Sequence, residues 1–362
     1  MVTLLYVGLV QWSYVYAVSP YLAYLAFVVG APSVLALTLS FMFALLPVLW
    51  MRVEFDKPSD LVQWIMYATV YIPAFVVMYR VLPLDQGLSI FSVALLGCQW
   101  GLGRILNVPH FRLKSPLFSQ TMFSALVYGA TIVLYAHVVI AFGFQIRWVS
   151  LADVYNVRYE YRDSIIAAGS TVAYAVSWLA NVMNPLLFAL GLTRRKFWLV
   201  VLSLSGQLML YSITGLKSLL FSGLFLTVIV FVLRSRGSKF GTSIVAGLSF
   251  VILLSVLLDK LANTAVFSSL FIRRELDMSG LLTTYYFEFF RDNPKAMLGH
   301  SILKGIVRSS YQTTPPFIIG EAFFGNPQMS ANANFWADAF ANFGYIGLFS
   351  FALLLGIILW LY

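Results

Sequence analysis

The sequence has little of what a soluble protein needs at its surface. Only 10% of its 362 residues are charged, whereas 60% are hydrophobic and the mean hydropathy is +0.86. A typical soluble domain carries about 25% charged residues, so this chain has too few to cover a water-soluble globule. Uncharged apolar stretches of about 18 residues or more recur, and each can cross a bilayer as a helix. We therefore expect an all-α, multi-span membrane protein.

Other absences narrow the chemistry. The one cysteine, Cys98, lies in an apolar stretch, which excludes an intrachain disulfide and a cysteine-based metal site. There is no phosphate-binding loop, no His-Glu-x-x-His zinc motif and no Gly-x-Ser-x-Gly nucleophile motif. No soluble segment of useful size carries a basic patch with interleaved aromatic residues, which argues against nucleic-acid binding. The first charge is Arg52, so no basic region marks a cleavable signal peptide.

Ten membrane-spanning helices are predicted from the apolar stretches. Residues 1–51 are uncharged and long enough for two helices of about 20 residues each, with the turn GAPS at 30–33 between them. The other eight are expected at 61–79, 86–103, 116–145, 165–192, 197–213, 218–233, 240–258 and 339–362. The single membrane domain, 1–362, is thus divided into nine helices within 1–258, a large external segment at 259–338 and a last helix. Because the sequence ends inside an apolar run, further C-terminal helices are expected.

Basic residues predict the orientation. Positive residues of short loops favour the cytoplasmic side, and ten spans place three basic connectors on one side together with Arg52 and Lys57. The connectors carry Arg104, Arg112 and Lys114; Arg194, Arg195 and Lys196; and Arg234, Arg236 and Lys239. That side holds 11 Lys and Arg against three acids, a net charge of +8, and the other side has a net charge of +1, which together give the total of +9. We therefore expect a cytoplasmic N-terminus and an external 259–338 segment.

The external segment is too apolar for an ordinary solvated loop. LANTAVFSSLFI at 261–272 is a run of 12 residues, too short to span and suited to an interfacial or re-entrant helix. The aromatic run that includes Tyr285 and Tyr286 suits the water–membrane boundary, and stacking on sugar rings is the functional alternative. The segment is expected to be partly helical and to lie on, or dip into, the outer leaflet.

Several cations fall on the predicted outer face. The pair Arg273 and Arg274 fits both headgroup snorkelling and bidentate phosphate binding. Lys217 lies in the short turn TGLKS between two apolar spans. A cation in that position is costly unless it has a partner.

Two further pairs have helical i,i+4 spacing. Arg158 and Arg162 lie among tyrosines, where a solvated loop face and a binding face are equally compatible with the pattern. Lys304 and Arg308 share a helix face with His300. A single histidine is more often structural, but a stripe of cations beside it favours an anionic ligand.

The most unusual stretch is MSANANFWADAFANFGYIGLF at 329–349, which has amides and an acid at the start of an apolar helix. Asn334, Asp338 and Asn342 are four residues apart and project on one face if the helix begins near Asn334. Such a stripe cannot face hydrocarbon. It is either an interhelical hydrogen-bond seam or the polar wall of a substrate cavity.

Three stretches resemble one family. They are TGLKS at 214–218, RRELD at 273–277 followed by TTYYFEFFRDNPKAMLGHSI at 283–302, and NANFWADAFANFGYIGL at 332–348. Together they resemble the O-antigen or oligosaccharide repeat unit polymerases of bacteria. The resemblance implies a GT-C-like membrane glycosyltransferase that joins oligosaccharides carried on undecaprenyl diphosphate at the outer face of the cytoplasmic membrane. It further implies no cofactor, no nucleotide sugar and no essential metal.

The implied reaction suggests roles for the polar residues. With no metal, fixed cations must meet the charge of the leaving diphosphate, and the acceptor hydroxyl needs a base. The expected catalytic residues are Arg273, Arg274, Lys217, His300 and Asp338, with Glu288 a weaker candidate for the base. The expected substrate-binding residues are Arg158, Arg162, Tyr285, Tyr286, Lys304, Arg308, Asn332, Asn334 and Asn342.

Other functions compete with this one. O-antigen ligase is also an outer-face GT-C enzyme and is poorly separated by sequence. A flippase for lipid-linked glycans would want charges at mid-membrane and two related halves, whereas the charges here crowd the outer surface. A non-catalytic scaffold would not need Lys217 or the polar stripe. The expected partners are the lipid-linked oligosaccharides, membrane lipids, a chain-length regulator and a flippase.

Overall fold

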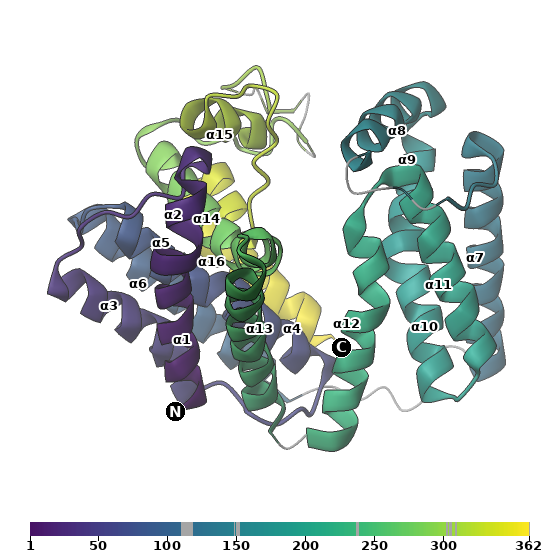
Figure 1. Ribbon diagram of the computed structural model, residues 1–362, viewed down its shortest axis with the longest axis horizontal. Helices are drawn as coiled ribbons and strands as arrows, with labels where there is room; N and C mark the ends of the chain where they lie inside the picture. Colours follow the sequence, from purple (N-terminus) through teal and green to yellow (C-terminus); the bar gives the residue numbers. More distant parts are fainter. Residues whose placement is uncertain are drawn as a thin grey trace. The chain divides into compact units, whose positions relative to one another are not determined.

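The computed structural model describes residues 1–109, 119–147, 149, 153–236, 239–301, 303, 306–307 and 310–361, and these residues form helices and no β-strand. Two compact units are visible in Figure 1. Unit 1 consists of Met1–His110 and Arg236–Tyr362, and unit 2 consists of Phe111–Ser235. The single membrane domain expected from the sequence is therefore built from two units, the second inserted into the first.

The helices of each unit follow the chain order. Those of unit 1 are α1 (Val2–Ser13), η1 (Tyr14–Val18), α2 (Ser19–Leu22), η2 (Ala23–Leu25), α3 (Val34–Leu45), η3 (Leu46–Leu49), α4 (Pro58–Met66), η4 (Tyr67–Tyr71), α5 (Ile72–Val81), α6 (Gln86–Leu106), α13 (Phe240–Ala262), η7 (Ser268–Asp277), α14 (Met278–Asp292), α15 (Pro315–Phe324) and α16 (Phe335–Trp360). Those of unit 2 are α7 (Gln120–Phe142), α8 (Val154–Ala168), α9 (Ser170–Trp178), η5 (Leu179–Met183), α10 (Asn184–Thr193), α11 (Phe197–Thr214) and α12 (Lys217–Arg236).

Nine helical runs among the described residues are long and apolar enough to cross a membrane, so the chain is a polytopic all-α membrane protein. They are Val2–Leu25, Pro58–Val81, Gln86–Leu106, Gln120–Phe142, Thr171–Thr193, Phe197–Thr214, Lys217–Arg234, Phe240–Ala262 and Phe335–Trp360. They match nine of the ten predicted spans. The second span expected within 1–51 is the shorter apolar run Val34–Leu49. The span expected at 165–192 begins later because the separate polar helix α8 precedes it.

Short polar residues begin several of these helices. Ser33, Asp85 and Ser119 precede α3, α6 and α7, and their side-chain oxygens accept the backbone N–H three residues on at 3.1, 2.6 and 3.1 Å. Each cap satisfies one of the N–H groups that the first helical turn leaves without a partner. The helix starts are thus encoded locally by the sequence.

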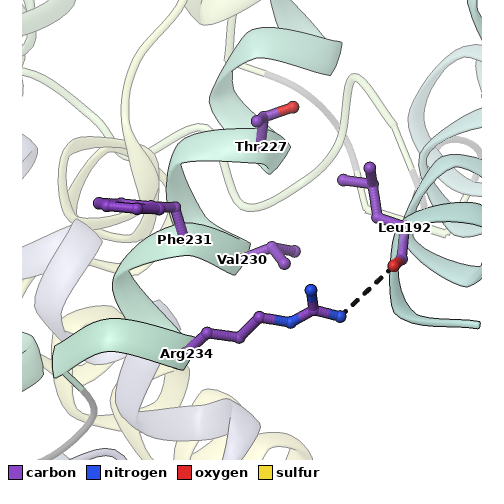
Figure 2. Close-up of a pocket in the computed structure, with 5 residues that line it drawn as sticks. All are labelled: Leu192, Thr227, Val230, Phe231 and Arg234. Carbon is purple, nitrogen blue, oxygen red and sulfur yellow. Dashed lines mark hydrogen bonds between the residues drawn. The ribbon is translucent and has the colours of Figure 1, made fainter. Parts of the chain in front are cut away.

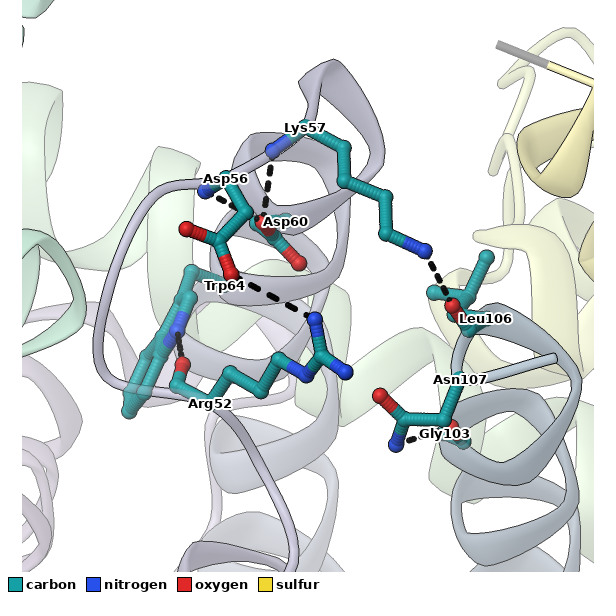
Figure 3. Close-up of polar contacts among 8 residues, drawn as sticks. All are labelled: Arg52, Asp56, Lys57, Asp60, Trp64, Gly103, Leu106 and Asn107. Atoms are coloured by element: carbon teal, nitrogen blue, oxygen red, sulfur yellow. Dashed lines mark hydrogen bonds and ion pairs between the residues drawn. The ribbon is translucent and has the colours of Figure 1, made fainter. Parts of the chain in front are cut away.

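Polar contacts join the start of α4 to the end of α6 (Figure 3). The Lys57 ammonium donates to the Leu106 carbonyl at 2.5 Å, and Asp60 accepts the Lys57 N–H at 2.9 Å. The Trp64 indole N–H donates to the Arg52 carbonyl at 2.6 Å. The basic loop that holds Arg52 and Lys57 is therefore fixed beside the basic end of α6.

Contacts at the helix ends define two opposite ends of unit 1. At the end with Arg52, the Gly241 N–H at the start of α13 donates to the carbonyl of Val53 at 2.9 Å. At the other end, Arg291 in the last turn of α14 forms an ion pair with Asp85, the cap of α6, at 2.8 Å. The grouping of the basic loops at one end is what the alternation of spans predicts within this unit. That this end faces the cytoplasm stays a prediction from the positive residues.

Helices α6 and α16 run parallel and pack closely along their length. The Phe91 and Phe340 rings meet edge to face at 5.0 Å between centroids. Further along, a Cβ at Gly97 would lie 3.5 Å from the Phe349 ring, and one at Gly356 would lie 2.7 Å from Ile105. Small residues that let two backbones approach are typical of membrane helix pairs. This packing fixes the helix that carries the most unusual polar stripe.

A seam of polar side chains joins the helices of unit 2. The Tyr135 hydroxyl donates to Asn184 Oδ1 at 2.9 Å, and the Ser203 hydroxyl donates to the Asn184 carbonyl at 2.7 Å. The Gln207 amide donates to the Ala180 carbonyl at 2.9 Å. Such bonds substitute for the hydrophobic driving force that lipid does not supply between helices.

Candidate functional site

Helix α16 begins where the sequence predicts, with Asn334 as its cap. Asn334 Oδ1 accepts the N–H groups of Trp336 and Ala337 at 3.1 Å each. Its amide nitrogen donates to Thr283 Oγ1 at 2.6 Å and to the Ser279 carbonyl at 3.0 Å, both on α14. The side chain of Asn334 is thus used to start α16 and to tie it to α14, rather than to line a substrate cavity.

Helix α16 is broken inside its apolar run at Gly344, which has φ 61° and ψ −140°. A break leaves carbonyls of the preceding turn without their helical donors. The segment that follows α14 supplies replacements: the Ala296 N–H donates to the Ala341 carbonyl at 2.9 Å, and the Met297 N–H donates to the Asn342 carbonyl at 3.1 Å. The segment is therefore bonded to the broken helix through its backbone.

Asn342 connects this segment to the face of α16. Its side chain is fully buried, and its Oδ1 accepts the Leu298 N–H at 2.9 Å. Its amide nitrogen donates to Asp338 Oδ1 at 3.1 Å and to the Asp338 carbonyl at 2.9 Å. Met297 and Leu298 both have a left-handed φ of 53°, a costly conformation for residues other than glycine that often accompanies function. Asn342 thereby holds one oxygen of the Asp338 carboxyl in place.

His300 lies two residues after Leu298 in the same segment. It is close enough to Asp338 for the two side chains to interact electrostatically. Its Nδ1 is buried and has no hydrogen-bond partner in the described part of the chain. A carboxyl and an imidazole that interact electrostatically in partly buried positions are suited to take or give a proton. The structure thus brings together the two residues that the sequence ranked first as bases.

Lys295 supports the same segment and was missed by sequence reasoning. Its ammonium donates to the carbonyl of Phe290 and lies 4.8 Å from the centre of the Phe340 ring. Burial lowers the pKa of Lys295, because the charged form is disfavoured away from water. The Lys295 stem also lies 3.1 Å from the position of a Cβ on Gly344. The helix break and the segment are therefore packed against each other.

The two tyrosines of the α14 aromatic cluster are buried inside unit 1. Tyr285 and Tyr286 are 5% and 0% exposed, and their hydroxyls donate to the carbonyls of Ala26 at 2.7 Å and Ala331 at 2.9 Å. Tyr285 also stacks on Phe323 with a centroid distance of 4.2 Å. Burial raises the pKa of Tyr285 to about 12. The two tyrosines thus pack α14 against its neighbours, and their expected role at the membrane boundary or in sugar stacking stays a prediction.

The arginine pair lies on η7, one step before α14. The Arg273 Nε donates to Ser269 Oγ at 3.1 Å. The Arg274 side chain is 50% exposed and its nearest carboxylate, Glu275, is 4.0 Å away. A contact this loose leaves the Arg274 guanidinium accessible to an anion. Asn332, the remaining expected sugar-binding residue of this unit, is exposed and accepts a bond from Ser330 at 3.1 Å.

Asp277, where η7 meets α14, is a second residue that sequence reasoning passed over. It is fully buried, and neither carboxyl oxygen has a hydrogen-bond partner among the residues described. Burial raises its pKa well above 3.8. Its charge would act on Tyr6 and Tyr14 of the first helical run.

The expected cations of unit 2 gather around the TGLKS turn. The Arg158 Nε donates to the Gly215 carbonyl in this turn at 3.2 Å. Lys217 begins α12 and is half-buried, with no hydrogen bond or ion pair to any described residue. Arg162, one turn beyond Arg158 on α8, is exposed. The structure thus places Arg158 at the Lys217 turn, and leaves Arg162 on the outer side of its helix.

A polar pocket of about 240 Å³ opens beside α8 in the same unit. It is lined by Phe142, Gln145, Arg147, Glu160, Tyr161, Ser164 and Ile213. Arg147 and Glu160 face each other across 3.8 Å, and the Arg147 backbone is held by Ser212, whose hydroxyl donates to its carbonyl at 2.7 Å and accepts its N–H at 2.9 Å. The sequence did not single out this pair, since it shows no spacing that distinguishes it from a solvated loop.

Two expected substrate-binding residues, Lys304 and Arg308, lie outside the described residues. In the part of the chain that the structure describes, no three His, Cys, Asp or Glu side chains are grouped to hold a metal ion. No protein-family model, no curated protein sequence and no solved structure matches the chain. The site must therefore be interpreted from its own residues.

Proposed function

We propose that this chain is a bacterial membrane glycosyltransferase that polymerises oligosaccharide repeat units carried on undecaprenyl diphosphate. Its product would be a surface polysaccharide such as an O-antigen, a capsule or an exopolysaccharide. The observation that carries the proposal is the meeting of Asp338, Asn342 and His300 at the break in α16. Polar groups at such a position in a membrane bundle are expensive and usually functional. The resemblance of 332–348 to repeat unit polymerases supplies the substrate class.

In the proposed reaction, a hydroxyl of the acceptor sugar attacks the anomeric carbon of the donor glycan. The new carbon–oxygen bond forms as the bond to the diphosphate breaks, and the diphosphate leaves with the electron pair. The hydroxyl proton passes to the pair formed by Asp338 and His300, which acts as general base. A diphosphate leaves without protonation, so the second carboxylic acid of a glycosidase is not needed.

The leaving diphosphate requires positive charge. Fixed cations aimed at developing charge stabilise a transition state because they need no reorganisation. The candidate cations are the accessible Arg274 with its neighbour Arg273, and Lys217 with Arg158. The reaction would take place at the outer face of the cytoplasmic membrane, where a flippase delivers the substrate and a chain-length regulator limits the product.

The test uses the purified protein in vesicles with lipid-linked repeat units, a chelator and no nucleotide. A ladder of longer glycans is the expected result, and its absence with otherwise competent substrate would contradict the proposal. A parallel reaction contains lipid A core as acceptor. One transfer to that acceptor without a ladder would identify a ligase instead.

Asp277 favours one competing function. A fully buried acid with no partner in the described bundle is a feature expected of transporters, which hold charges inside the membrane domain. Under this second candidate, the chain is a flippase for lipid-linked glycans. Movement of labelled substrate between leaflets without any ladder, lost in Asp277→Asn, would favour the flippase over the polymerase.

A further inference from the structure

A second pocket in unit 2 has a different character from the polar one. It measures about 300 Å³ and lies between the end of α10 and the last turns of α12 (Figure 2). It is lined by Leu192, Thr227, Val230, Phe231 and Arg234. Four of these side chains present apolar atoms, and Arg234 supplies a charge at one end. The two helices belong to candidate membrane spans, so the pocket lies along a membrane-spanning part of unit 2.

The packing of α12 explains why a groove forms at this place. In its first half, Gly223 lets α12 approach Phe188 of α10, where an added Cβ would lie 3.3 Å from the ring. The Gln207 amide also donates to the Ser222 hydroxyl at 3.2 Å. Beyond Gly223 the positions carry larger side chains, and the helix ends are joined by one long bond from Arg234 to the Leu192 carbonyl at 3.4 Å. The second half of α12 thus flanks a groove.

The groove is suited to a hydrocarbon chain. The Thr227 hydroxyl donates its proton to the Gly223 carbonyl at 2.8 Å inside its own helix, and its methyl group adds apolar surface. Val230 and Leu192 add branched aliphatic surface, and Phe231 is 68% exposed. Aliphatic and aromatic side chains without free polar groups make a surface that an acyl chain can cover.

The end of the groove is strongly cationic. Arg194, Arg195 and Lys196 are exposed directly after α10, and Arg234 bonds to the same helix end. The sequence has no Asp or Glu between Asp163 and Asp259, so the helices that flank the groove carry no acid of their own. A cluster of Lys and Arg at the end of membrane helices attracts anionic lipid headgroups.

We propose that this groove binds one anionic glycerophospholipid. The phosphate meets Arg234 and the cluster Arg194, Arg195 and Lys196, and one acyl chain lies along Val230 and Phe231. Charge complementarity selects this occupant: a zwitterionic lipid brings its own cation to the site, and a free phosphate leaves the apolar surface uncovered. The site is separate from the proposed catalytic residues and does not depend on the proposed function.

The test is lipid-dependent stabilisation of the whole purified chain in detergent. Thermal unfolding is followed with phosphatidylglycerol, phosphatidylcholine or sn-glycerol 3-phosphate, and native mass spectrometry counts bound lipid. Phosphatidylglycerol is expected to raise the midpoint and to bind as one retained molecule. Arg234→Gln is expected to weaken its apparent affinity about tenfold, the change that about 1.4 kcal/mol produces.

The matched control is Arg104→Gln, which removes an exposed arginine from the end of α6 in unit 1, where it lies over Trp100. This variant should keep the full response to phosphatidylglycerol. If Arg234→Gln does not fold, the double variant Arg194→Gln, Arg195→Gln takes its place. The proposal would be overturned if phosphatidylcholine or glycerol phosphate stabilised the wild-type protein as much as phosphatidylglycerol does. It would also be overturned if phosphatidylglycerol stabilised Arg234→Gln and Arg104→Gln to the same extent. A dimer that forms through this face without bound lipid would do the same.

Discussion

The polar groups around Asp338 in unit 1 and those around the polar pocket in unit 2 are held in different ways. In unit 1, Asn342 is fully buried and bonded on both ends of its amide, and Asn334 is bonded to two helices. In unit 2, the charged pair Arg147 and Glu160 is 55% and 70% exposed, and Arg162 is exposed. Buried bonds therefore fix the direction of the polar groups at the break in α16, whereas the charges beside the polar pocket are exposed to solvent.

This difference suggests where each step of the proposed reaction belongs. Bond-making steps need groups held within about 0.5 Å of the productive geometry by buried supporting contacts, and Asp338 has such a contact from Asn342. Exposed cations are screened and mobile, which suits attraction and binding of a large anionic substrate. Under the proposed function, we therefore assign the acid–base step to Asp338 and His300, and charge neutralisation to the candidate cations.

The largest effect is expected from Asp338→Asn. The amide keeps the size of the side chain but cannot accept a proton, so the polymerisation rate should fall by about 10²–10⁴-fold, the usual contribution of a general base. The rate of ladder growth in vesicles measures it. Glu321→Gln, at an exposed acid on α15, is the matched control and should keep the wild-type rate. A normal rate in Asp338→Asn would remove the acid–base step from unit 1.

The next effect is expected from Lys217→Ala in unit 2. Loss of one cation that stabilises the negative charge of the leaving group lowers the rate roughly 10²-fold. Long glycan chains should therefore disappear while the protein still inserts. Lys260→Ala, at an exposed cation in the last turn of α13, should leave the length of the glycan chains unchanged. Chain-length analysis on gels provides the measurement. Normal chains in Lys217→Ala would remove Lys217 from the cations proposed to meet the diphosphate.

A smaller effect, on stability, is expected when alanine replaces the glycine at the break in α16 rather than an ordinary helical glycine. Gly344→Ala places a Cβ at φ 61° and near the Lys295 stem, and should cost about 1–3 kcal/mol of stability. Gly101→Ala in α6, where a Cβ meets nothing within 4 Å, should gain up to about 1 kcal/mol. Thermal unfolding of both variants measures the difference. Equal midpoints would show that the break does not depend on glycine.

The smallest effect is expected from Asp277→Asn and depends on pH. Burial raises the pKa of Asp277 in the folded state above 3.8, so stability linked to this group is fully present below that pH and is lost as pH rises toward the raised value. The amide removes this loss. Asp277→Asn should therefore unfold at a higher temperature than wild type at neutral pH, with little difference near pH 3. A variant less stable than wild type at neutral pH would show that the carboxylate has a stabilising partner.

Much of the fold could be predicted from the sequence because long apolar runs predict membrane helices directly. Nine predicted spans have counterparts in the structure. The last span was expected from residue 339, and α16 begins earlier, after its cap Asn334, which is the start that places Asn334, Asp338 and Asn342 on one face. The meeting of Asp338 and Asn342 on one face follows from the same spacing.

The remainder depends on contacts between distant segments. No periodicity in the sequence predicts that the N–H groups of residues 296 and 297 bond to the backbone carbonyls of residues 341 and 342. These bonds depend on the break in α16 at Gly344. The aromatic run around Tyr285 looked like an interface because composition does not distinguish a core helix from a boundary helix. Asp277 went unnoticed because its burial is decided by the helices packed around it.

The central claim is that Asp338 and His300 act as one unit in proton transfer. A double-mutant cycle in the reconstituted assay tests it most directly, with Asp338→Asn, His300→Gln and the combined variant. Residues that act together show strongly non-additive losses. The account predicts that the double variant is no slower than the slower single variant. Losses that multiply in the double variant would contradict it, since the two side chains would then act independently.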